Sequence, residues 1–87
     1  MKLPDALQAY LDKHYTAATS AGYGRQIAAY LGNCPSAATA GYAEVLTYIG
    51  QLRQRYDNAH TLARELAAIK VYYDWLCDSG QRQDHPA

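Results

Sequence analysis

The chain has 87 residues, of which 49% are hydrophobic and 18% charged, and its 8 acidic and 8 basic residues give a formal net charge of zero. These values predict one globular domain, and they exclude a wholly disordered chain and a strong overall attraction to nucleic acid or anionic membranes. No apolar run approaches the ~20 residues of a membrane span and the first residues lack a signal-peptide pattern, so we expect no membrane partner and a cytoplasmic protein.

Two helices are predicted in the first part of the chain. The first begins near Pro4 and has an apolar stripe made by Leu3, Leu7, Tyr10, Leu11 and His14. The second covers residues 16–34, with Thr16 as its cap and an inward face made by Tyr23, Ile27, Tyr30, Leu31 and Cys34. Gly22 and Gly24 weaken this helix by about 1 kcal/mol each relative to alanine, which indicates that either a crossing helix or a ligand approaches the backbone.

A third helix is predicted after a short loop at Pro35. Thr39 is its expected cap, and its apolar stripe is formed by Tyr42, Val45, Leu46, Ile49, Leu52 and Tyr56. Arg53 and Arg55 lie near its C-terminal end, where positive charge complements the helix dipole.

The fourth helix, over residues 58–77, is the element around which the chain is organised. Asn58 is its predicted cap and Gly80 lies where a C-terminal glycine is favoured. One face carries an apolar stripe of Leu62, Leu66, Ile69, Tyr73 and Leu76. The opposite face carries His60, Arg64, Ala67, Ala68, Val71 and Trp75. This second face predicts either a helix at the centre of a bundle, with Trp75 shielded, or a partly basic surface for a partner.

The predicted fold class is all-α, a compact bundle of four helices, because no segment alternates as a strand does. No catalytic or phosphate-binding motif occurs, and the nine tyrosines largely take the core positions of the missing phenylalanine. Cys34 and Cys77 are expected to be small core residues rather than a disulfide. The three histidines, at positions 14, 60 and 85, have no metal-ligand spacing, so neither a metal nor a cofactor is expected.

Three segments together resemble one known family. TAATSAGYGRQIAAYL (residues 16–31) resembles the family pattern S-x-x-T-x-x-x-Y-x-x-x-L-x-x-F, and NAHTLARELAAIKVYYDWL (residues 58–76) resembles S-x-x-T-x-x-R-x-L-S-A-L-R-x-F-Y-x-W-L. SGQRQDHPA (residues 79–87) is similar to the exit pattern G-x-x-x-x-N-P-A. The family is the N-terminal, SAM-like core-binding domain of tyrosine recombinases and phage integrases.

This resemblance implies a non-catalytic domain that grips duplex DNA through its second and fourth helices during DNA integration or recombination. Residues 1–80 would form the core-binding domain, and residues 81–87 a linker towards a C-terminal catalytic domain that this chain does not include. The implied partners are duplex DNA, the catalytic domain of the same parent chain, and other copies assembled on DNA.

The DNA-binding residues implied by the resemblance come from the two gripping helices: Thr16, Thr19, Arg25, His60, Thr61, Arg64 and Lys70. Hydroxyl groups and helix-start amides bind phosphate oxygens, whereas arginine also reads guanine. Arg64 is the strongest candidate because it has no acidic residue one turn away, whereas Lys70 could instead pair with Asp74. Ala67 replaces a frequent serine, and His85 replaces the usual asparagine.

The alternative hypothesis is a helical protein–protein interaction module without DNA binding. In that case the face formed by Ala68, Val71 and Trp75 would bind a partner helix.

Overall fold

The computed structural model describes residues 3–86, which form four α-helices and one short 3₁₀-helix. In chain order these are α1 (Asp5–His14), α2 (Ala17–Asn33), η1 (Ala37–Thr39), α3 (Tyr42–Arg55) and α4 (Ala59–Asp78). No strand occurs within residues 3–86. The all-α class and the bundle of four helices predicted from the sequence are therefore confirmed.

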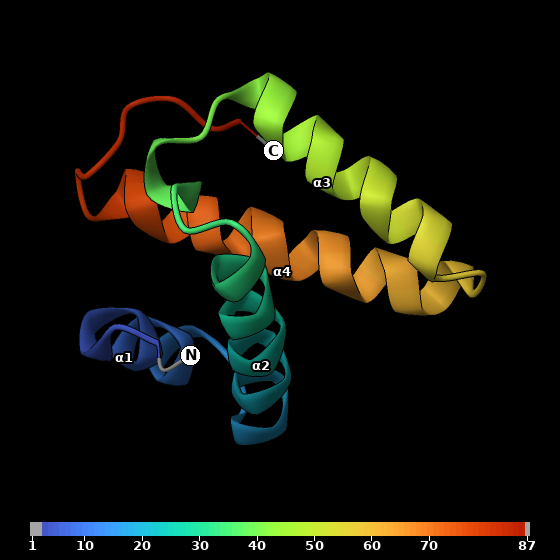
Figure 1. Cartoon of the computed structure of the whole chain (residues 1–87). Coiled ribbons are helices and arrows are strands. Elements are labelled where there is room, and N and C mark those ends of the chain that lie inside the picture. The colour runs from blue at the N-terminus through green and yellow to red at the C-terminus, as the bar shows by residue number, and fades with distance from the viewer. Residues whose placement is uncertain (1–2, 87) are drawn as a thin grey trace.

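Helix α4 lies at the centre of the bundle. Figure 1 shows α3 on one side of α4 and α1 with most of α2 on the other, and α2 crosses α4 in the most extensive helix contact. Both faces of the second half of α4 are consequently buried. Trp75 is only 8% exposed, as predicted, and Ala68 and Val71 are 0% and 6% exposed. The face assigned to a partner helix by the alternative hypothesis is thus covered by the domain itself.

The core is rich in tyrosine. The rings of Tyr30 and Tyr48 lie edge to face with 4.7 Å between centroids, and Tyr72 and Tyr73 pack beside them. The hydroxyl oxygens of Tyr30 and Tyr73 are 2.6 Å apart, and the Tyr73 hydroxyl donates to the carbonyl oxygen of Ala37 at 2.8 Å. Burial raises the pKa of both phenols, so both are neutral at physiological pH. These hydrogen bonds let polar rings occupy positions that phenylalanine could fill.

Side chains cap α2 and α4 as the sequence predicted. Thr16 accepts from the backbone N–H of Thr19, and Asn58 accepts from those of His60 and Thr61. Gly80 follows α4 with a left-handed backbone conformation, at a φ of 76°, and backbone hydrogen bonds at this glycine close the end of the helix.

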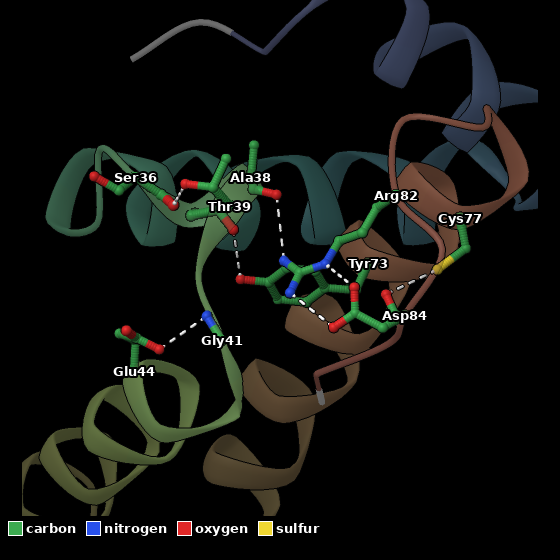
Figure 2. A network of polar contacts seen from close by, with 10 residues as sticks. Ser36, Ala38, Thr39, Gly41, Glu44, Tyr73, Cys77, Arg82 and Asp84 are labelled. Atoms are coloured by element: carbon green, nitrogen blue, oxygen red, sulfur yellow. Dashed lines mark hydrogen bonds and ion pairs between the residues drawn. The ribbon is translucent and has the colours of Figure 1, made fainter.

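The cap predicted for α3 is wrong. Thr39 belongs to η1, and α3 starts after Gly41, whose N–H donates to the Glu44 carboxylate at 2.8 Å (Figure 2). The acidic side chain three residues into the helix, rather than a hydroxyl before it, satisfies the exposed amide.

The predicted stripe of α3 is partly wrong as well. Val45 and Leu52 are buried, but Tyr42 and Leu46 are 66% and 46% exposed, and Tyr48 is 6% exposed instead. Among the helices, α3 makes its main contact with α4 alone, so only a narrow face at positions 45, 48 and 52 is covered. His14, expected on the inward stripe of α1, is also exposed, because α1 ends there. Leu7 and Leu11 are the buried residues of α1, and Tyr10 packs partly buried against the core.

Residues 81–86 have no regular secondary structure, but they pack back against α4. The guanidinium of Arg82 lies 5.3 Å from the ring centroid of Tyr73, donates to the carbonyl oxygen of Ala38, and forms a two-pronged ion pair with Asp84 (Figure 2). His85 lies 2.8 Å from a carboxylate oxygen of Asp74. Whether this segment links to a further domain stays a prediction.

Candidate nucleic-acid interface

An open groove of about 470 Å³ lies between the first halves of α2 and α4. Small residues on both helices, Ala18 and Gly22 on one and Ala63 and Ala67 on the other, leave this space open. The remaining lining residues are larger: Thr19, Tyr23, Gln26, His60 and Arg64. The groove therefore combines polar side chains from both helices with a larger share of apolar surface.

The two glycines of α2 are approached from different elements. A Cβ at the buried Gly22 would lie 3.8 Å from Nη2 of Arg64, so the guanidinium of α4 extends over the α2 backbone at this point. A Cβ at Gly24 would lie 3.3 Å from a methyl carbon of Leu3 and 3.8 Å from the Gln8 amide oxygen. Gly22 thus belongs to the groove, whereas Gly24 accommodates the N-terminal segment.

The electrostatics of the groove favour an anion. Helix α2 contains no acidic residue, and the first turns of α2 and α4 contain none either. Helix N-termini carry about half a positive charge each, and both helices contribute their N-terminal halves to the groove. Burial raises the pKa of Glu65, next to Arg64 in the sequence, and the positive charges of Arg55 and Arg64 offset part of that rise.

Three of the seven predicted site residues line this groove together: Thr19, His60 and Arg64. In the part of the chain that the structure describes, the side chains of His60 and Arg64 form no hydrogen bond or ion pair with the protein. Arginine carries five donors, so its hydrogen-bonding capacity remains available to a ligand.

The other four predicted residues lie outside the groove lining. Thr16 caps α2, and its hydroxyl donates to the Thr19 hydroxyl at 3.0 Å, which leaves the Thr19 proton available. Thr61 is partly buried in the first turn of α4, while Arg25 and Lys70 are exposed on the surfaces of α2 and α4. The alternative pairing of Lys70 with Asp74 is not formed, and Asp74 pairs with His85 instead.

Among the polar residues of the groove, sequence reasoning placed Tyr23 on the inward face of its helix and missed Gln26. Gln26 lines the groove and is half-buried, one helical turn after Gly22. The predicted site residues are basic or carry a hydroxyl group, and none is an amide. The position of Gln26 four residues after Gly22, on the same face of the helix, is the sequence feature that could have indicated it.

The structure offers little for other site chemistry. A second cavity of about 280 Å³ lies against the loop between α2 and α3, where burial raises the pKa of the Cys34 thiol. Over residues 3–86, no group of three or more His, Cys, Asp or Glu side chains converges to hold a metal ion. Nor does that span contain a helix long and apolar enough to cross a membrane.

Comparison with known protein families matches residues 5–80 to the phage integrase N-terminal SAM-like domain. Comparisons with curated proteins and with solved structures found no match. The matched region begins at the first residue of α1 and ends at the glycine that closes α4, and it includes both helices that border the groove. The chain therefore belongs to the family of phage integrase N-terminal SAM-like domains, as its sequence motifs suggested.

Proposed function

We propose that this chain is the DNA-gripping domain of a tyrosine recombinase, and that it binds duplex DNA at the groove between α2 and α4. Family membership supports the general role, since this domain is a non-catalytic part of integrases. The observation that carries the proposal is the convergence of Thr19, His60 and Arg64 from two helices. These side chains border a groove to which α2 contributes no acidic residue.

The chemistry of the groove suits a nucleic-acid backbone and base edges. The Thr19 hydroxyl accepts a hydrogen bond from Thr16, so its own O–H can donate to a phosphate oxygen. The guanidinium of Arg64 can bind phosphate or pair with the O6 and N7 atoms of guanine. On this proposal Arg25 and Lys70 contact phosphates that flank the groove, and Thr16 and Thr61 order the two helix starts.

In this proposal the chain does not cleave DNA by itself. Strand cleavage belongs to a separate catalytic domain of the parent protein, reached through the segment that starts at residue 81. Copies of the protein would assemble on DNA. Protein–protein contact as a second role is favoured by one observation, the exposure of Tyr42 and Leu46 one turn apart on α3.

A titration of the ¹⁵N-labelled chain with a 16-base-pair duplex tests the proposal. Chemical shift changes should map to α2 and the first half of α4, with a dissociation constant on the order of 10⁻⁴–10⁻⁶ M. With about three to five phosphates contacted, the logarithm of affinity should fall against that of salt with a slope of roughly −3 to −4.

Arg64→Ala should weaken binding by about 1–3 kcal/mol if the side chain reads a base. Arg53→Ala is the matched control, because Arg53 is exposed in the last turn of α3 and outside the groove, and it should leave affinity unchanged. Lys70→Ala should lower the salt slope by about one on every sequence. Shifts confined to α3, or no shifts at low salt, would show that the groove is not the DNA-binding surface.

A further inference from the structure

Gln26 is a half-buried side chain of the groove, and its amide is engaged by no protein group within the described residues. Elsewhere in the domain, two polar side chains that are fully buried form hydrogen bonds with other side chains. Ser20 bonds to Asp12, and Tyr30 bonds to Tyr73. A glutamine with two donors and one acceptor carbonyl is therefore held beside Arg64 with its hydrogen-bonding capacity intact.

Gln26 and Arg64 line the same groove from two different helices. Nη2 of Arg64 lies 3.8 Å from the position of a Cβ on Gly22. Gln26 follows Gly22 by four residues on the same helix face, where neighbouring side chains start about 5–6 Å apart. Successive base pairs are about 3.4 Å apart along a strand. The guanidinium therefore lies within about 10 Å of the start of the Gln26 side chain, close enough for the two groups to reach the same base pair or neighbouring ones.

The two side chains have different base preferences. Arginine pairs with the two acceptors of guanine, O6 and N7. Glutamine pairs with adenine, donating to N7 and accepting from the N6 amino group, a combination that no other base offers at that spacing in the major groove. The free donor and acceptor of Gln26 match adenine, whereas a phosphate would use the donor alone.

We propose that Gln26 is a specificity-determining residue that reads adenine in the major groove, next to a guanine read by Arg64. This inference rests on the proposed function. It goes beyond that function because it assigns the side-chain amide of Gln26 to one base. It also predicts that the preferred site holds an A·T pair beside a G·C pair.

The test compares two self-complementary 16-base-pair duplexes, one alternating A and T and the other alternating G and C. Affinities of the wild-type chain and its variants are measured by NMR titration at one salt concentration, and the readout is the ratio of the two dissociation constants. Gln26→Ala should weaken binding to the A·T duplex relative to the G·C duplex by about fivefold or more. Arg64→Ala should change this ratio in the opposite direction.

Two controls separate base reading from a general effect. Gln51→Ala, at an exposed glutamine of α3 outside the groove, should leave the ratio unchanged. Replacing adenine by 7-deazaadenine removes the N7 acceptor, so it should weaken the wild-type complex and have no effect on Gln26→Ala. Far-UV circular dichroism should show an intact helical fold for each variant.

The outcomes distinguish this inference from the proposed function. If Gln26→Ala leaves the ratio unchanged while Arg64→Ala still weakens binding, adenine reading is wrong and the groove remains the DNA site. If the wild-type chain binds neither duplex at low salt, the proposed function fails and this inference fails with it.

Discussion

The buried pair of Tyr30 and Tyr73 gives the most discriminating test of how this fold is held together. Each phenol has one proton. Tyr73 donates its proton to the carbonyl oxygen of Ala37 at 2.8 Å, so in the 2.6 Å contact between the two hydroxyls Tyr30 must be the donor. The chain of hydrogen bonds therefore runs in one direction, from Tyr30 through Tyr73 to Ala37. Removal of each hydroxyl should have a different cost.

Tyr30→Phe removes one hydrogen bond and should lower the free energy of unfolding by about 1 kcal/mol, because Tyr73 keeps its bond to Ala37. Tyr73→Phe removes both bonds and leaves the Tyr30 hydroxyl buried without a partner, which should cost about 2–4 kcal/mol. The Ala37 oxygen still accepts a hydrogen bond from the Ala40 N–H at 3.2 Å, so the loss of its bond from Tyr73 adds little to this cost. The double variant lacks the orphaned hydroxyl and should cost about 2 kcal/mol.

Urea unfolding of the four proteins, followed by circular dichroism, measures these differences if the slope with denaturant stays constant. The expected result is that the double variant is at least as stable as Tyr73→Phe alone. In thermal melts, each kcal/mol should shift the midpoint by about 4–8 °C. A Tyr30→Phe variant as costly as Tyr73→Phe, or costs that simply add, would refute the direction of the chain of hydrogen bonds.

Three further predictions concern two glycines, the cap of α4 and Tyr10. Gly50→Ala on α3, where a Cβ meets nothing within 4 Å, should raise the free energy of unfolding by about 0.5–1 kcal/mol. Gly80→Ala, at a φ of 76°, should lower it by about 1 kcal/mol. Equal effects of the two substitutions in urea unfolding would contradict this. Asn58→Ala should cost about 1 kcal/mol by the same measurement and Asn58→Gly only a few tenths, because the lost group is the cap oxygen. Burial and the bond to Asp78 raise the pKa of Tyr10 to about 12, above its unfolded value of about 10, so the stabilisation that the neutral phenol gives below pH 10 should be lost as the pH rises from 10 through 12. Tyr10→Phe should lose less stability over that interval than the wild-type chain, and an equal loss in both would exclude this contribution.

The sequence was sufficient for most helices and caps, because periodic apolar residues and local capping signals determine them. Leu7 and Leu11 of α1, and Ile69, Tyr73 and Leu76 of α4, are buried as their spacing indicated. The prediction was wrong for α3, where a continuous stripe was assigned across Tyr42 and Leu46. Periodicity shows which residues share a face but not how wide a face the neighbouring helix covers, and α3 is covered only narrowly.

The packing of residues 81–86 was not predictable for a related reason. Its contacts are individual pairs with residues outside the segment: Arg82 with Tyr73 and with the carbonyl oxygen of Ala38, and His85 with Asp74. Such pairs leave no periodic signal in the chain. The groove was half predictable in the same sense. Thr19, His60 and Arg64 were predicted, whereas Gln26 has neither the charge nor the hydroxyl group that marks a phosphate ligand.

A zero net charge is compatible with a DNA-binding groove because acidic and basic side chains are used differently in this fold. Five acidic residues accept hydrogen bonds or form ion pairs within the domain: Asp12, Glu44, Asp74, Asp78 and Asp84. Among the lysine and arginine side chains between residues 3 and 86, only Arg82 is paired in this way. The others, Arg64 among them, form no hydrogen bond or ion pair within the described residues, so their donors are available to a phosphate, although Glu65 lies close enough to Arg55 and Arg64 to interact with their charges. The salt dependence of DNA binding should therefore follow the number of phosphates that these cations contact, and not the net charge of the chain.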